Sequence, residues 1–397
     1  MKKSWLVAVS AMAASGAAMA ESAVTMYGLI DESILINTNQ GGGRAVRLSD
    51  NGTRGNRLGL IGTENLGNGN SAIFRLENGF NATTGSMGQG ARLFGSQAYV
   101  GLAGKFGSLL AGRQINSDVS LVAADFAAAT QWAGILGAHP GDVDNLYDTF
   151  RVPRALKYIA PQVHGLKVQV LYAPGGAAGH AARGRVASVA ATYAIGSFVV
   201  GGGFNNAQTP NLGLAAGTAA ANSSIDPSVA NYISPVNSGF SSAHTYQVIS
   251  AGAAYRSGPT TLAVLYTNTQ FRGLGDLSSG PNPLQYTGTA TFHNVEINAR
   301  YAISPVFSIA AAYNVTTRNS VSTVQNPAGL GSARYVQATV GMQYLLQKTV
   351  FIYAEMMIQE ASGTDSTGQS AVAAGNVLSP SSNRRQSAAR MGLNVSF

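Results

Sequence analysis

The stretch HNVEINARYAI, residues 293–303, alternates between two kinds of side chain. Its apolar positions are Val295, Ile297, Ala299, Tyr301 and Ile303, and its polar positions are Asn294, Glu296, Asn298 and Arg300. Successive side chains of a β-strand point to opposite faces. The alternation therefore predicts a strand with one apolar face and one face in contact with water.

The same pattern recurs at distant places in the chain, around residues 166–172, 335–346 and 389–397. The uncharged, mostly apolar segment 186–203 allows a second interpretation, a membrane-spanning helix. We interpret it as two strands, because Gly196 and Ser197 interrupt it near the middle with a turn signal.

The polar gaps between the expected strands alternate in length. Long gaps lie near 37–56, 81–91, 117–150, 174–184, 206–243, 271–289, 318–332 and 360–384, and short turns lie near 64–70, 103–107, 160–165, 195–197, 256–260, 302–306 and 345–349. Such a rhythm joins sixteen strands, with fourteen or eighteen as alternatives, and long loops on one side only are typical of bacterial membrane barrels. A soluble β-sandwich has no reason to sort its loops in this way. We therefore predict an all-β fold, a transmembrane antiparallel 16-stranded β-barrel.

The physics of the bilayer requires such a barrel to close. Every backbone N–H and C=O group in hydrocarbon must find a partner within the protein, which an open sheet edge cannot provide. We therefore expect the first strand to pair with the last. The composition agrees with this fold, because only 11% of the residues are charged, compared with about 25% in a soluble domain.

The N-terminus has the pattern of a secretory signal peptide. Lys2 and Lys3 precede a short apolar run, and Ala18-Met19-Ala20 has the small-x-small form of a cleavage site. We predict a cleaved segment 1–20 and a barrel domain 21–397. An N-terminal membrane anchor is the alternative, but the apolar run is shorter than the about 20 residues that a spanning helix needs.

Other functions lack the residues that they require. The chain has no cysteine, its five histidines lack metal-ligand spacing, and no cofactor motif is present. The net charge of +8 comes from basic residues scattered singly, so we predict no nucleic-acid partner. We expect neither a metal nor a cofactor, and we do not expect an enzyme.

Several stretches resemble the general porins of Gram-negative bacteria, in particular the β-proteobacterial type. These are MYGLID at 26–31, NRLGLIGTENLG at 56–67, AIFRLE at 72–77, QAYVGL at 97–102, and the terminal Phe397. Each stretch is short, but their order along the chain is specific. The resemblance implies an outer-membrane location and a homotrimer of barrels, with the third long loop, 117–150, folded into each pore.

The resemblance also implies an arginine ladder on the pore wall that faces acids on the loop. By position, Arg57, Arg113 and Arg151 match the ladder, and the wall set that we predict is Arg57, Arg75, Glu77, Arg113, Arg151 and Lys157. The acids that we predict at the constriction are Asp118, Asp125, Asp142 and Asp144, with Asp142 and Asp144 as the preferred pair. The alternatives are ordinary lumen charges on the wall and outward-facing acids on the loop. Ser96 and Ile61 depart from the family pattern, because they stand where basic residues are common.

The expected function is a water-filled channel for passive diffusion of ions and small hydrophilic solutes, with a weak preference for anions. The alternatives are a solute-specific channel for small organic anions or sugars and, less favoured, a barrel enzyme or an adhesin. The expected partners are outer-membrane lipid, lipopolysaccharide and the barrel-assembly machinery. By the resemblance, that machinery recognises Phe397.

Overall fold

The computed structural model describes residues 23–176, 178–211, 214, 234–376 and 378–397. The predicted signal peptide, 1–20, lies outside these residues, as does most of the long gap near 206–243.

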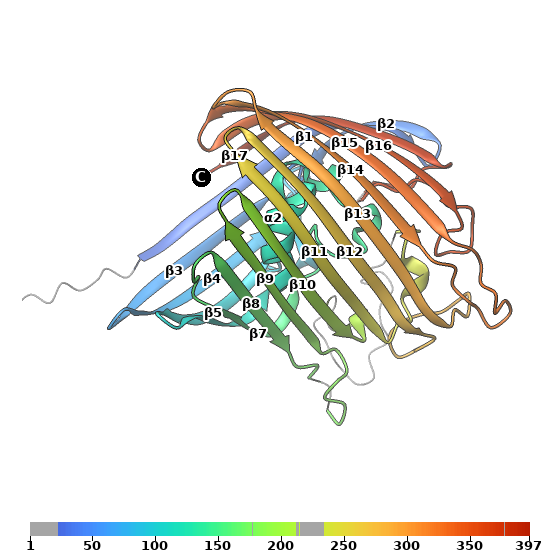
Figure 1. Cartoon of the computed structure of the whole chain (residues 1–397), viewed down its shortest axis with the longest axis horizontal. Coiled ribbons are helices and arrows are strands. Elements are labelled where there is room, and N and C mark those ends of the chain that lie inside the picture. Colours follow the sequence, from blue (N-terminus) through green and yellow to red (C-terminus); the bar gives the residue numbers. More distant parts are fainter. Residues whose placement is uncertain (1–22, 177, 212–213, 215–233, 377) are drawn as a thin grey trace, which may run out of the picture.

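The chain forms one antiparallel sheet that closes on itself (Figure 1). Its strands are β1 Ala23–Gln40, β2 Gly43–Asp50, β3 Arg57–Gly67, β4 Asn70–Gly79, β5 Gln97–Gly104, β6 Gly107–Gln114, β7 Val152–Ile159, β8 Leu166–Ala173, β9 Val186–Ile195, β10 Phe198–Gln208, β11 Thr245–Ser257, β12 Thr260–Leu274, β13 Gly288–Ala302, β14 Phe307–Arg318, β15 Ala333–Gln347, β16 Val350–Gly363 and β17 Arg385–Ser396. The segment 186–203 forms β9 and the first part of β10, so its interpretation as two strands is confirmed.

Within the described residues, sixteen of these strands make the barrel wall, as predicted. β2 is an addition inside the first long gap, where it pairs with the second half of β1 from Glu32↔Asp50 to Gln40↔Gly43. The first half of β1 pairs with β3. On its other edge, β1 pairs with β17 from Leu29↔Ser396 to Asn37↔Ala388, which confirms the predicted closure of first strand on last.

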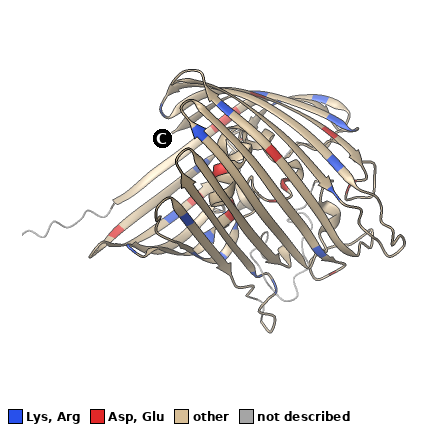
Figure 2. Ribbon diagram, in the orientation of Figure 1, with Lys and Arg blue, Asp and Glu red and all other residues tan. Residues whose placement is uncertain are grey.

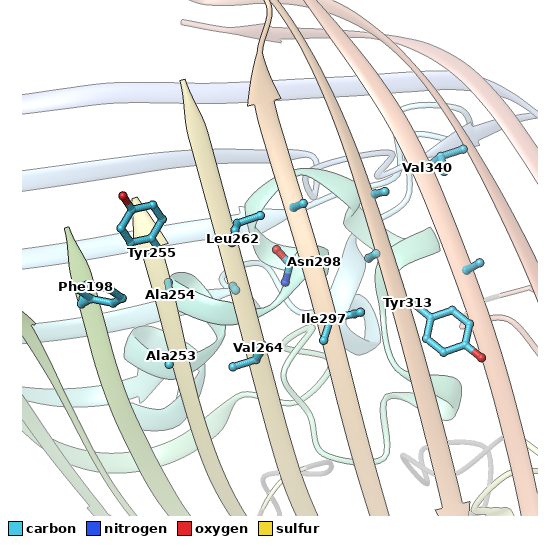
Figure 3. A pocket seen from close by; sticks show the side chains of 15 residues that line it. Phe198, Ala253, Ala254, Tyr255, Leu262, Val264, Ile297, Asn298, Tyr313 and Val340 are labelled. Atoms are coloured by element: carbon cyan, nitrogen blue, oxygen red, sulfur yellow. The ribbon is translucent and has the colours of Figure 1, made fainter. Parts of the chain in front are cut away.

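The apolar face of the sheet is outside. In β13, Val295 and Ile297 are 52% and 53% exposed, whereas Glu296 between them is 1% exposed. Figure 2 shows β10–β12 with charged residues only near their ends. A shallow apolar groove of about 600 Å³ lies on this outer face. Figure 3 shows Tyr255 and Leu262 among the side chains that line it. An exposed apolar belt with polar side chains inside is the arrangement that lipid requires, because a charge facing the bilayer midplane costs about 2–4 kcal/mol.

The helices are short and lie in the connections. They are α1 Gly88–Ala91, η1 Val119–Ala123, α2 Ala124–Phe126, η2 Ala129–Ala133, η3 Gly134–Gly137, η4 Pro140–Asp142 and η7 Ser238–Phe240. Those between residues 119 and 137 lie in the third long gap. Among the described residues, no single helix is long and apolar enough to cross a membrane, and only the bent pair Val119–Phe126 and Ala129–Gly137 reaches that length and composition together.

Candidate pore constriction

The segment 115–151, which contains the third long gap, lies against the polar inner face of the barrel. Figure 1 shows α2 behind the strands β11–β13. Gln337 and Thr339 of β15 donate to the carbonyl of Leu136 at 3.2 and 2.9 Å. The guanidinium of Arg390 in β17 donates to the carbonyl of Ala133 at 3.1 Å and pairs with Glu355 at 2.6 Å. The backbone of the segment is therefore bonded to wall strands far away in sequence.

Two glycines of the wall allow aromatic side chains of this segment to approach closely. A Cβ on Gly252 would lie 2.4 Å from the ring of Phe126, and one on Gly341 would lie 2.9 Å from the ring of Trp132. Both distances are too short for any other residue. The segment therefore rests directly on the backbone of β11 and β15.

A buried histidine bridges the segment and the wall. His139 Nδ1 lies 2.6 Å from Asp144 Oδ2, and His139 Nε2 lies 3.0 Å from Glu296 Oε2 on β13. Burial alone would lower the pKa of His139, but the Asp144 and Glu296 carboxylates raise it well above 6.5. A protonated imidazole between two carboxylates is a charge-assisted link.

The same two carboxylates accept further hydrogen bonds. Thr267 and Asn294 donate to Asp144 at 2.7 and 3.3 Å, and the backbone N–H of Ala128 donates to Glu296 at 2.8 Å. The carboxylate of Asp144, which we predicted at the constriction, is thus enclosed between the segment and the wall.

Asp142 and Asp118 are also enclosed. Asp142 is 2% exposed and accepts hydrogen bonds from the backbone of Tyr147 and from the hydroxyl of Thr149. Asp118 is fully buried beside Ser188 of β9. Burial raises the pKa of both acids to about 6. The preferred pair Asp142 and Asp144 therefore stabilises the fold of the segment and has little contact with lumen water.

The remaining acids of the segment are paired with arginines. Asp125 lies 2.9 Å from Arg256 of β11, and Asp148 lies 3.0 Å from Arg151, which directly precedes β7. Both carboxylates are partly exposed. Of the acids in the segment, they have the most access to water, and each has a cation beside it.

Two of the predicted wall arginines lack a carboxylate partner among the described residues. In the part of the chain that the structure describes, no acidic oxygen lies within 4.0 Å of Arg57 or Arg113. Each is held instead by a neutral carbonyl, Arg57 by Gly55 at 3.0 Å and Arg113 by Gly95 at 2.7 Å. Both side chains are partly exposed.

The other predicted wall residues bond with their neighbours. Arg75 pairs with Glu77 at 2.7 Å, and Tyr27 donates to the same carboxylate at 2.6 Å. Ser96 also donates to Glu77, so this acid has a neutral donor at a position where basic residues are common in the family pattern. Lys157 is buried and donates to the hydroxyl of Ser120 at 2.7 Å, which ties β7 to the start of the 115–151 segment.

A second inward connection comes from the first long gap. The buried carboxylate of Asp31 accepts hydrogen bonds from Thr53, from the backbone of Arg54 and from Asn394 of β17. The carbonyl of Gly52 accepts from Ile135 at 3.4 Å. Arg54 is thereby held inside the barrel beside the 115–151 segment.

The predicted site residues did not include the side chains that anchor these segments, Asp31, His139, Glu296, Glu355 and Arg390, or the nearby Arg54 and Arg300. For Glu296 and Arg300 a signal existed, because both lie on the polar face of the stretch that predicted the strand. Their partners come from distant segments, which no local pattern indicates. Among the described residues, no group of three or more His, Cys, Asp or Glu side chains is arranged to hold a metal ion.

An antiparallel barrel with an apolar outer belt and a charged interior defines a transmembrane β-barrel of the bacterial outer-membrane type. The family model for Gram-negative porins matches residues 7–364, and the chain belongs to that family. The predicted family and the predicted outer-membrane location are confirmed.

The curated relatives come from β-proteobacteria. An outer membrane porin protein of Bordetella pertussis is 35% identical over 188 residues, which are 43% of this chain and 48% of that protein. Outer membrane porin protein 32 of Delftia acidovorans is 34% identical over 180 residues, 44% of this chain and 50% of that protein. The matched part of this chain thus spans about half the length of these relatives.

Solved structures share the fold over almost the whole chain. An anion-selective porin from Comamonas acidovorans has a TM-score of 0.68 at 17% identity, covering 95% of this chain and all of that one. The trimer form of OmpT, an outer membrane protein of Vibrio cholerae, has a TM-score of 0.61 at 14% identity, covering 95% and 99%. At these identities the similarity concerns the fold alone.

Proposed function

We propose that this porin forms a water-filled channel through which ions and small hydrophilic solutes diffuse passively, with a preference for anions. The observation that carries the preference is the unequal burial of the two signs of charge. Throughout the 115–151 segment, which the structure describes in full, every acid is buried or paired with a cation. Arg57 and Arg113 are partly exposed and have no carboxylate partner among the described residues.

An excess of one or two positive charges has a large effect in a narrow pore. Field lines concentrate where low-dielectric walls enclose the water, which raises the local concentration of the opposite ion. Salt screens this effect over about 10 Å at 0.1 M. We therefore expect the preference for anions to be strongest at low salt.

The reversal potential in a planar bilayer under a potassium chloride gradient tests this proposal. The wild-type channel should favour chloride. The double variant Arg57→Gln with Arg113→Gln removes the two positive charges that have no carboxylate partner among the described residues. It should lower the ratio of chloride to potassium permeability by about twofold or more.

A matched control is Arg272→Gln, because Arg272 is exposed near the far end of β12 and bonds to Gln247. This variant should keep the wild-type ratio. A wild-type channel that favours potassium, or a double variant with an unchanged ratio, would contradict the proposal.

The assembly is proposed on the same basis. We propose a homotrimer in contact with outer-membrane lipid and lipopolysaccharide, with Phe397 as the signal for the insertion machinery. The trimer form of the Vibrio cholerae barrel supports the first part. Enzymatic activity is not part of the proposal, since passive diffusion needs no catalytic group.

A further inference from the structure

A small polar cavity lies between the 115–151 segment and the wall, apart from the wall arginines Arg57 and Arg113. Its volume is about 150 Å³. Arg300 comes from β13, Lys348 from the short turn between β15 and β16, Arg54 from the first long gap, and Trp132 from η2. Short turns of bacterial barrels lie on the periplasmic side, which places the cavity toward that exit.

The side chains that line the cavity carry positive charge and no negative charge. Its lining includes three cationic side chains, from Arg54, Arg300 and Lys348, and no Asp or Glu. Within the described ranges of the chain, no carboxylate oxygen lies within 4.0 Å of these cations.

Neutral groups hold Arg300 in place. Its guanidinium donates to the hydroxyl of Ser308 at 3.1 and 3.2 Å and to Gln343 Oε1 at 3.1 Å. Arg54 is close enough for the two guanidinium charges to repel each other. Like charges inside a protein are unfavourable unless an opposite charge comes between them.

A buried donor points to the same ligand chemistry. Trp132 lines the cavity and is 3% exposed, yet its indole Nε1 has no hydrogen-bond acceptor among the described residues. The ring atoms Cε3 and Cζ3 face Gly341, and Nε1 is on the opposite edge of the indole. Buried donors without a partner are uncommon in native proteins and call for an explanation.

We propose that this cavity is a binding site for a small oxyanion of the phosphate type, occupied by anions on their way through the channel. Acceptor oxygens would satisfy the Trp132 indole, and the negative charge would compensate the three cations. The inference rests on the proposed anion-preferring channel and adds to it a saturable site on the periplasmic side.

The experiment is a titration of the chloride current with inorganic phosphate in a planar bilayer. The wild-type current should fall in a saturable way. Removing one cation, in Arg300→Gln or Lys348→Gln, should raise the half-blocking concentration about tenfold, since charge-assisted hydrogen bonds are the strong ones. Trp132→Phe keeps an aromatic side chain but removes the N–H donor, and should raise the half-blocking concentration about fivefold.

Lys167→Gln is the matched control. Lys167 lies at the start of β8 and is exposed, opposite Thr192 of β9. The replacement therefore removes the same charge as Lys348→Gln, but from another part of the wall. The half-blocking concentration should not change. If Lys167→Gln weakens the block as much as Lys348→Gln, or if the wild-type block does not saturate, the cavity is not a binding site.

Tryptophan fluorescence provides a second readout that does not depend on conduction. The chain contains Trp5 and Trp132 only, and Trp5 lies in the predicted signal peptide. In protein purified from outer membranes, phosphate should change the Trp132 emission with the same half-saturation as the block. A channel that prefers potassium but whose Trp132 emission responds would contradict the proposed function alone. A chloride-preferring channel with no such response would contradict the site alone.

Discussion

At the scale of single residues, aromatic rings pack over glycines where β1 pairs with its neighbouring strands β17 and β3. The backbone groups of Gly28 and Phe397 exchange two hydrogen bonds, of 2.9 and 3.0 Å. A Cβ on Gly28 would lie 2.3 Å from the Phe397 ring. Gly59 with Tyr27 repeats this arrangement on the neighbouring pair of strands, with 2.4 Å to the ring. An aromatic ring over a glycine covers backbone that would otherwise lack a side chain to pack against.

The closeness of the Phe397 ring to Gly28 therefore predicts that Gly28→Val destabilises the folded barrel. The valine side chain must displace the Phe397 ring, and such overpacking typically costs about 1–3 kcal/mol. The folded fraction can be measured as the heat-modifiable band in gel electrophoresis. We expect a clear loss relative to wild type.

Gly43→Val is the matched control, because the atom nearest to a Cβ there is a backbone oxygen at 3.9 Å. It should fold normally. In the double variant Gly28→Val with Phe397→Ala, the valine no longer clashes with a ring. The loss of folded fraction should therefore be smaller than the sum of the losses in the two single variants. Full additivity would show that the ring over Gly28 is not the reason for the loss.

At the scale of elements, the 115–151 segment depends on the charge of one histidine. The link from His139 to Asp144 and Glu296 needs a protonated imidazole. Because the pKa of His139 is raised in the folded protein, this stabilisation is complete below pH 6.5 and is lost as the pH rises through the raised value. We expect the segment to loosen in the alkaline range.

The matching prediction concerns His139→Gln. Removing one partner of a buried charged link typically costs about 3–5 kcal/mol, because the remaining charges stay buried without compensation. Single-channel recordings should show more current noise at neutral pH than wild type, and no further increase at alkaline pH. Wild type should become noisy only as the pH rises.

The control is His180→Gln, because His180 is an exposed histidine in a connection. It should behave as wild type at every pH. A quiet wild-type channel throughout the alkaline range, or the same noise in both variants, would refute the role of His139.

At the scale of the whole molecule, closure leaves no described wall strand with an unpaired edge. Every wall strand pairs on both edges, and β1 pairs with β17. Such a barrel should give a β-rich circular dichroism spectrum and a heat-modifiable band. In mild detergent we expect three times the mass of one chain, measured by light scattering. A helical spectrum would contradict the fold, and a monomer would contradict the proposed trimer.

The fold was largely predictable from the sequence because lipid leaves few choices. Period-two alternation, the sorting of long and short gaps, and the need to close the sheet each follow from local patterns and from backbone hydrogen bonding in hydrocarbon. The addition of β2 was not predicted, because the first long gap shows no pattern strong enough to separate a short hairpin from a loop.

The sequence by itself thus determined the barrel, the strand count and the face on which Glu296 and Arg300 lie. Only the tertiary structure decided which charges meet water. Asp142 and Asp144 look like exposed loop acids in sequence, yet both are buried. Asp144 accepts hydrogen bonds from Thr267 of β12 and Asn294 of β13, more than a hundred residues away. Asp142 accepts hydrogen bonds from Tyr147 and Thr149 of its own segment. Burial and ion pairing depend on which distant segments the closed barrel and its packed loops bring into contact. No periodic pattern in the sequence indicates such contacts.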